Sequence, residues 1–90
     1  MKKLDKFTEA LANLNSEREV EQFCSELFSP KELSDFSLRW QLLKELHRGD
    51  PQRAIAERHG ISLCKITRGS KILKSKDSII LKMLNKGSKI

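Results

Sequence analysis

The chain has 90 residues, of which 38% are hydrophobic and 33% charged. This is the size and composition of one small soluble domain, and it excludes most enzyme architectures. Since the sequence has neither a long apolar run nor a signal-peptide pattern, we expect a cytoplasmic protein with no membrane partner.

Charge is distributed unevenly along the chain. The formal net charge is +6, and residues 61–90 alone carry 8 basic and 1 acidic side chains, or +7, whereas residues 1–30 carry 4 and 6, or −2. Charge alone suits any polyanionic partner, whether nucleic acid or an anionic membrane surface, and says nothing about specificity.

Neither metal nor covalent chemistry is indicated. Cys24 and Cys64 are too few and too far apart for a disulfide framework, and we expect both to be small buried thiols in a reducing cytosol. With His47 and His59 they form no pair with the short spacing of a zinc site, so we predict no metal. No catalytic carboxylate pair or Cys–His set is visible, and we expect no enzyme.

The first two predicted helices have one apolar stripe each. The first stripe fades at Asn13–Asn15, and Ser16 with Glu19 then forms an S-x-x-E capping box that begins a second helix. The apolar positions are Leu4, Phe7, Leu11 and Leu14 in the first helix, and Val20, Phe23, Cys24, Leu27 and Phe28 in the second.

The third predicted helix begins with the strongest signal in the chain. Ser29 caps it, Pro30 takes the first helical position, and Glu32 completes a capping box. We expect this helix to run to about His47 and to end at Gly49. Its apolar arc between residues 33 and 46 is wide enough to be buried on two sides, and in so short a chain the second layer is expected from another subunit.

Two short helices separated by Gly60 follow. Asp50-Pro51 repeats the combination of a cap and a proline, and predicts a helix over 51–59. Gly60 supplies the positive φ of a tight turn, and Ser62 caps a helix over 63–74.

This pair of helices has the spacing of a helix-turn-helix. Ala56 is small where the helices touch, and Ile61 and Ile66 fill the wedge between them. The second helix exposes side chains suited to base edges and phosphates, which are Ser62, Lys65, Thr67 and Arg68. A plain packed helical hairpin is the alternative, but the +7 charge of the same third favours DNA binding.

A final helix is expected over about 77–86, ended by Gly87. The predicted fold is therefore all-α, with six short helices in a single domain. Within it we expect dimerisation and ligand-pocket helices at 1–49, a DNA-reading head at 50–74, and a C-terminal helix and tail at 75–90.

The segment around this hairpin resembles the tryptophan repressor family. The resemblance is carried by Ile66-Thr67-Arg68-Gly69-Ser70 directly after the helix-turn-helix, by Leu46-His47-Arg48-Gly49-Asp50, by Gln52-Arg53, by S-P-x-E at 29–32 and by Arg39. It covers residues 26–74 well and the remainder only by pattern. It implies an intertwined homodimer that binds L-tryptophan as corepressor and represses transcription at a near-palindromic operator in double-stranded DNA.

The resemblance also implies a ligand site. The matched residues are Arg39, Arg68, Gly69, Ser29, Phe28 and Glu26. The two arginines would sandwich the indole, with Arg68 also reaching the carboxylate, which suits a planar guanidinium. Gly69 would leave room beside the indole ring, and Ser29 would offer a hydroxyl. The backbone carbonyls of Phe28 and Glu26 would receive the ammonium. From the residues alone, Arg39 can also be a solvated helix charge.

DNA contacts are implied in the same way. The matched residues are Gln52, Arg53, Leu63, Cys64, Lys65, Thr67 and Lys74. Gln52 and Arg53 would begin the first reading helix, and Lys74 would contact phosphate. The other four residues would lie on the recognition helix, facing the major groove. The tryptophan repressor family is itself a familiar example of this docking.

Three positions depart from the family pattern. Ile72 replaces a serine that contacts the ligand ammonium, the connection at Pro51-Gln52 is one residue shorter, and Lys65 replaces a smaller polar residue. The first departure favours an alternative in which a helix-turn-helix regulator takes no amino acid, or a different indole. A third hypothesis is a basic helical interaction module that binds RNA or an acidic protein.

Overall fold

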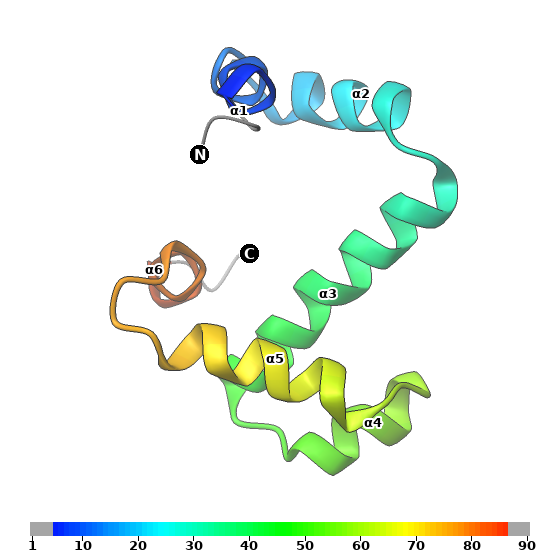
Figure 1. The fold of residues 1–90 in the computed structure, drawn as a ribbon, viewed down its shortest axis with the longest axis vertical. Coiled ribbons are helices and arrows are strands. Elements are labelled where there is room, and N and C mark those ends of the chain that lie inside the picture. Colours follow the sequence, from blue (N-terminus) through cyan, green and yellow to red (C-terminus); the bar gives the residue numbers. More distant parts are fainter. Residues whose placement is uncertain (1–4, 87–90) are drawn as a thin grey trace. The chain divides into compact units, whose positions relative to one another are not determined.

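The computed structural model describes residues 5–86, and over this range it contains six helices and no strand (Figure 1). The helices are α1 (Asp5–Ala12), α2 (Glu17–Leu27), α3 (Pro30–Arg48), α4 (Gln52–His59), α5 (Leu63–Lys74) and α6 (Ile79–Lys86). The all-α prediction is confirmed. The expected apolar position Leu4 and the expected stop at Gly87 lie outside the described residues.

The chain divides into two compact units, residues 1–35 and residues 36–90, and α3 contributes to both. In the first unit the ring of Phe7 on α1 lies 6.2 Å from that of Phe23 and 6.4 Å from that of Phe28, measured between centroids. These contacts hold α1 on α2. No residue of α2 is fully buried, and Leu27 is 54% exposed.

The predicted helix starts at α2 and α3 are confirmed. The Ser16 hydroxyl accepts from the Glu19 N–H at 3.1 Å, while the Glu19 carboxylate accepts from the Asn15 N–H. At α3 the bonds are reciprocal: the Ser29 hydroxyl accepts from the Glu32 N–H at 3.1 Å, and the Ser29 N–H donates to the Glu32 carboxylate at 2.8 Å. Each box satisfies N–H groups that lack partners within the helix.

The predicted caps of α4 and α5 are wrong in detail. Pro51 is the N-cap of α4, which begins one residue later than expected, because the Asp50 carboxylate is bound by arginines instead of capping N–H groups. Ser62 stands at the N-cap of α5 but makes no side-chain cap bond. The last helix begins at Ile79 rather than at 77, and the Ser78 hydroxyl accepts from the N–H of Leu81.

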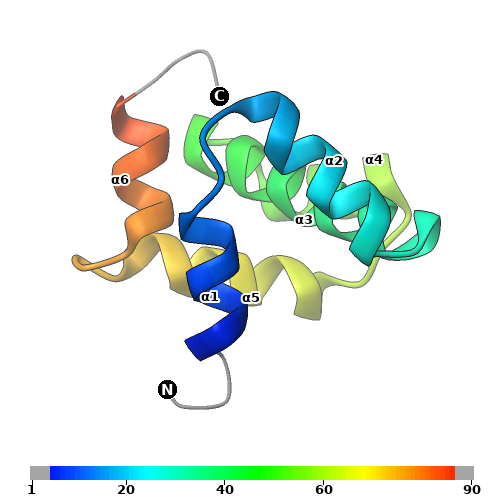
Figure 2. The same cartoon turned by 90° about the horizontal axis from the view of Figure 1, so that it is seen from above.

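The core of the second unit lies where α4 and α5 pack on α3. Ile55 and Ile66 are fully buried, and Leu42 is 5% exposed. Around them pack the partly buried Leu38, Leu46, Ala56 and Ile61. The wedge predicted from Ala56, Ile61 and Ile66 is therefore present, and Ile55 is a central core residue that the sequence reading missed. Figures 1 and 2 together show α6 running across α5.

The expectation that both cysteines are buried needs correction. Cys64 is exposed on α5 and Cys24 is half-buried, so neither is the enclosed thiol that its apolar neighbours predicted. The wide apolar arc of α3 is only partly covered within this chain, since Leu42 and Leu43 are buried but Phe36 is 40% exposed.

Candidate ligand cavity and DNA-reading helices

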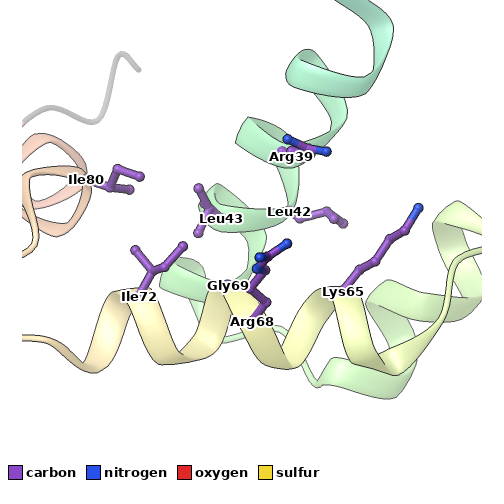
Figure 3. A pocket seen from close by; sticks show the side chains of 8 residues that line it. All are labelled: Arg39, Leu42, Leu43, Lys65, Arg68, Gly69, Ile72 and Ile80. Atoms are coloured by element: carbon purple, nitrogen blue, oxygen red, sulfur yellow. The ribbon is translucent and has the colours of Figure 1, made fainter. Parts of the chain in front are cut away.

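A cavity of about 500 Å³ opens between α3, α5 and α6 (Figure 3). Its lining consists of Arg39, Leu42, Leu43, Lys65, Arg68, Gly69, Ile72 and Ile80. Five of these eight residues are apolar and three carry cationic side chains. Apolar walls with a few convergent charged groups are typical of a small-molecule site, and these charges suit an aromatic ring with an anionic substituent.

Three predicted ligand residues meet at this cavity. Arg39 lies on α3, and its guanidinium carbon is 5.8 Å from the centroid of the Phe36 ring, within cation–π range. Arg68 and Gly69 lie on α5, and the Arg68 side chain extends from α5 toward the side on which Arg39 lies (Figure 3). The two guanidinium groups thus come from two different helices that share one cavity.

Gly69 has a packing role that the sequence did not predict. A Cβ at this position would lie 3.1 Å from Cδ1 of Leu46 and 3.3 Å from Cδ2 of Leu43. The missing side chain therefore lets α5 approach α3 closely, in addition to leaving space in the cavity.

The other predicted ligand residues lie in the first unit. Glu26 accepts a side-chain bond from Gln22 at 2.9 Å and borders a smaller hollow of about 300 Å³. Phe28 packs on Phe7, and Ser29 is engaged in the α3 capping box. The lining residues of the larger cavity all belong to the second unit.

The predicted DNA-binding residues are all exposed. Gln52 and Arg53 lie on the first turn of α4, and Leu63, Cys64, Lys65, Thr67 and Lys74 lie on α5. The Thr67 hydroxyl donates to the Leu63 carbonyl at 3.0 Å, so its oxygen remains an acceptor. Lys65 differs from the others because it also lines the cavity.

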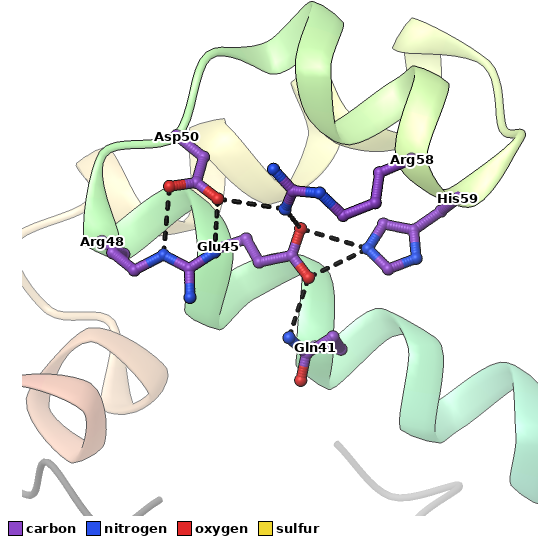
Figure 4. A network of polar contacts seen from close by, with 6 residues as sticks. All are labelled: Gln41, Glu45, Arg48, Asp50, Arg58 and His59. Carbon is purple, nitrogen blue, oxygen red and sulfur yellow. Dashed lines mark hydrogen bonds and ion pairs between the residues drawn. The ribbon is translucent and has the colours of Figure 1, made fainter.

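A buried carboxylate connects α3 to α4, and the sequence reading did not find it (Figure 4). Glu45 is 2% exposed; it accepts from Gln41 at 2.8 Å, lies 2.9 Å from Nε2 of His59, and pairs with Arg58. Arg58 also donates to Asp50 at 3.1 Å. The cluster secures the end of α4 nearest the turn of the helix-turn-helix.

Both carboxylates of this cluster have lowered pKa values. Burial raises the pKa of Glu45, but hydrogen bonds from Gln41 and His59, with the charges of His59 and Arg58, more than offset it, and the pKa is lowered from 4.5. Hydrogen bonds from Arg48 and Arg58 lower the pKa of Asp50 to about 2. Each group is therefore held as a carboxylate in the folded protein.

We expect the free energy of unfolding to fall under acid conditions. A carboxyl group whose pKa is lower in the folded than in the unfolded state stabilises fully above its unfolded pKa, and this contribution is lost as pH falls through the folded value. The loss should therefore begin below about pH 4.5 for Glu45 and extend toward about pH 2 for Asp50. Urea unfolding as a function of pH measures it.

The matched variants are Glu45→Gln and Glu57→Gln, because Glu57 is an exposed carboxylate on α4. Glu45→Gln should lower stability at pH 7 by about 1–3 kcal/mol, because the amide has no charge to pair with Arg58 and offers one acceptor oxygen where the carboxylate offers two. It should differ less from the wild type at acid pH. An equal effect of Glu57→Gln would contradict the role assigned to the cluster.

Among residues 5–86, no helix is long and apolar enough to cross a membrane. Over the same range, no group of three or more His, Cys, Asp or Glu side chains is arranged to hold a metal ion.

A helix-turn-helix on an all-helical core places the chain in the class of all-α transcriptional regulators. The chain belongs to the Trp repressor family, because the model of this family, described as Trp repressor protein, matches residues 2–88. This family consists of transcriptional regulators of the repressor type, not of enzymes. The Trp operon repressor homologs of Chlamydia trachomatis serovars L2 and D are each 36% identical over 83 residues, covering 87% of this chain and 88% of theirs. No solved structure matches significantly.

Proposed function

We propose that the chain is a cytoplasmic repressor that binds operator DNA as a homodimer, with L-tryptophan as corepressor. The observation that carries the ligand assignment is the cavity that Arg39, Arg68 and Gly69 share between α3 and α5. Family membership supports repression, and the Chlamydia relatives are named for the trp operon. In this proposal residues 1–49 dimerise and bind ligand, 50–74 read DNA, and 75–90 form a C-terminal helix and tail.

The proposed switch follows from where the cavity lies. A ligand shifts a conformational equilibrium only by its different affinity for the two states. A ring held between Arg39 on α3 and Arg68 on α5 would favour the orientation of α5 in which both walls contact it. With the ligand bound, the recognition helices of the two subunits would be held at one major-groove spacing.

The proposed dimer is supported by apolar surface that one chain leaves uncovered. Leu27 is 54% exposed, Phe36 40% and Ile79 72%. Large exposed side chains of this kind are typical of surfaces that another protein covers. The wide apolar arc of α3 leads to the same proposal, since Phe36 belongs to it.

A second candidate function retains DNA binding with a different indole as ligand. The observation that favours it is Ile72, which lines the cavity with a side chain that cannot accept a hydrogen bond from an ammonium group. The third hypothesis is a basic interaction module for RNA or an acidic protein. It differs from both candidates in expecting no preference for duplex DNA of one sequence.

Fluorescence anisotropy with operator-length double-stranded DNA and single-stranded RNA of equal charge tests the DNA assignment. We expect tighter binding to a duplex of one sequence than to a scrambled duplex, with both affinities falling as salt rises. Lys74→Ala should weaken binding to both duplexes by a similar factor, because a phosphate contact carries no sequence information. Equal affinity for RNA and for every duplex would support the interaction module instead.

A further inference from the structure

The three cationic side chains of the cavity include one that belongs to no predicted ligand contact. Lys65 lies one turn before Gly69 on α5, and both line the cavity with Arg68. In Figure 3 the Lys65 and Arg68 side chains extend from α5 toward the same side as Arg39 on α3. The lining therefore carries three positive charges, and none of its eight residues is acidic.

None of the lining side chains offers an acceptor to a cationic group. Arginine and lysine side chains only donate hydrogen bonds, and the remaining five lining residues are aliphatic or glycine. All eight lie within helices, where a backbone carbonyl accepts from the N–H four residues later. Near the end of α5, the Ile72 carbonyl accepts from the Ser75 N–H at 3.3 Å. The side chains of these walls therefore favour an anionic group over an ammonium.

We propose that Lys65 is a ligand-binding residue that makes this cavity discriminate by net charge, favouring aromatic acids with a net negative charge over zwitterionic amino acids. The proposal rests on the proposed function, because it concerns the same cavity. Lys65 and Arg68 share the carboxylate, while Ile72 and Ile80 provide apolar walls for the ring. In a zwitterion the ammonium group is repelled by the same lysine that attracts the carboxylate, and the contribution of Lys65 largely cancels.

The test is calorimetric titration of the full-length protein, without DNA, with two ligands that share the indole ring and the carboxylate. L-tryptophan carries the ammonium, and indole-3-propionate lacks it. Lys65→Met removes the charge and keeps a chain of similar length. We expect this substitution to weaken the binding of indole-3-propionate more than the binding of L-tryptophan. The ratio of the two affinities should change by on the order of fivefold, as for an exposed ion pair.

Two variants serve as controls. Lys65→Arg retains the positive charge and should leave the ratio near its wild-type value. Lys71→Met removes a charge from an exposed position on the same helix, outside the cavity lining, and should also leave the ratio unchanged. Because Lys65 and Lys71 are both exposed, neither substitution removes core packing.

Each result decides between the proposals. If Lys65→Met weakens the binding of both ligands equally, or of neither, Lys65 does not discriminate by ligand charge and the inference is overturned. The proposed function still stands as long as L-tryptophan binds the wild-type protein. If neither compound binds the wild-type protein, the ligand-dependent function is overturned together with the inference. A shift in the affinity ratio caused equally by Lys71→Met overturns the inference alone, since long-range charge would then explain it.

Discussion

Arg68→Ala should weaken L-tryptophan binding by at least about tenfold and remove its effect on DNA affinity. Hydrogen bonds to charged groups contribute about 1.5–3 kcal/mol each, and stacking of a guanidinium on an aromatic ring adds about 0.5–1 kcal/mol. Arg68 lies in the cavity wall formed by α5, so its loss removes the proposed carboxylate contact from the recognition helix itself. Calorimetric titration measures the first effect, and anisotropy with and without ligand measures the second.

Arg68→Lys separates the two contributions of the side chain. It keeps a positive charge but loses the planar fork and the stacking surface, and we expect an affinity between those of wild type and Arg68→Ala. Since Arg68 is exposed, the thermal midpoint should change little in both variants. A normal response of Arg68→Ala to L-tryptophan would show that the ligand binds elsewhere.

Ile55→Ala should cost about 2–5 kcal/mol of folding free energy, the usual range for truncating a fully buried aliphatic side chain. Ile55 is 0% exposed and is the only buried residue of α4. The free energy of unfolding of a small domain is only about 5–15 kcal/mol in total. In part of the molecules α4 should therefore separate from the core, and DNA binding should weaken as a result. Urea unfolding at fixed protein concentration measures the loss.

Leu63→Ala is the matched control, because Leu63 is an aliphatic residue of the same helix-turn-helix that is 44% exposed. Its effect on stability should be within about 0.5 kcal/mol, as for most surface substitutions. Equal destabilisation by the two substitutions would mean that the buried cluster around Ile55 does not hold the reading helices on α3.

Local signals predicted the helices well because their causes are local. The boxes Ser16–Glu19 and Ser29–Glu32 each act over three residues, and both helix starts appear as expected. Gly60 likewise ends α4 with a φ of +63°, in the left-handed region that glycine adopts without strain. The prediction failed at Asp50, whose carboxylate binds the side chains of Arg48, two residues earlier, and Arg58, eight residues later on α4, instead of capping N–H groups.

The parts of the site that depend on tertiary contacts were not predictable from the sequence. Glu45 is a glutamate on a helix, and only the packing of α4 against α3 shows that it is buried beside Arg58 and His59. Gly69 was assigned to the ligand site through the family resemblance, whereas its close approach to Leu46 depends on how α5 packs on α3. Lys65 was assigned to DNA alone because its sequence neighbours gave no sign of the cavity.

We propose that a ligand in the cavity between α3 and α5 controls DNA binding by α4 and α5. The most direct test of this proposal is a titration of one operator duplex with the protein, repeated without ligand and at saturating L-tryptophan. Typical allosteric coupling is about 1–3 kcal/mol, so we expect the affinity for the duplex to be roughly 5- to 150-fold higher with ligand. The affinity for L-tryptophan should rise by the same factor when DNA is present. An operator affinity that is the same with and without the ligand would contradict it.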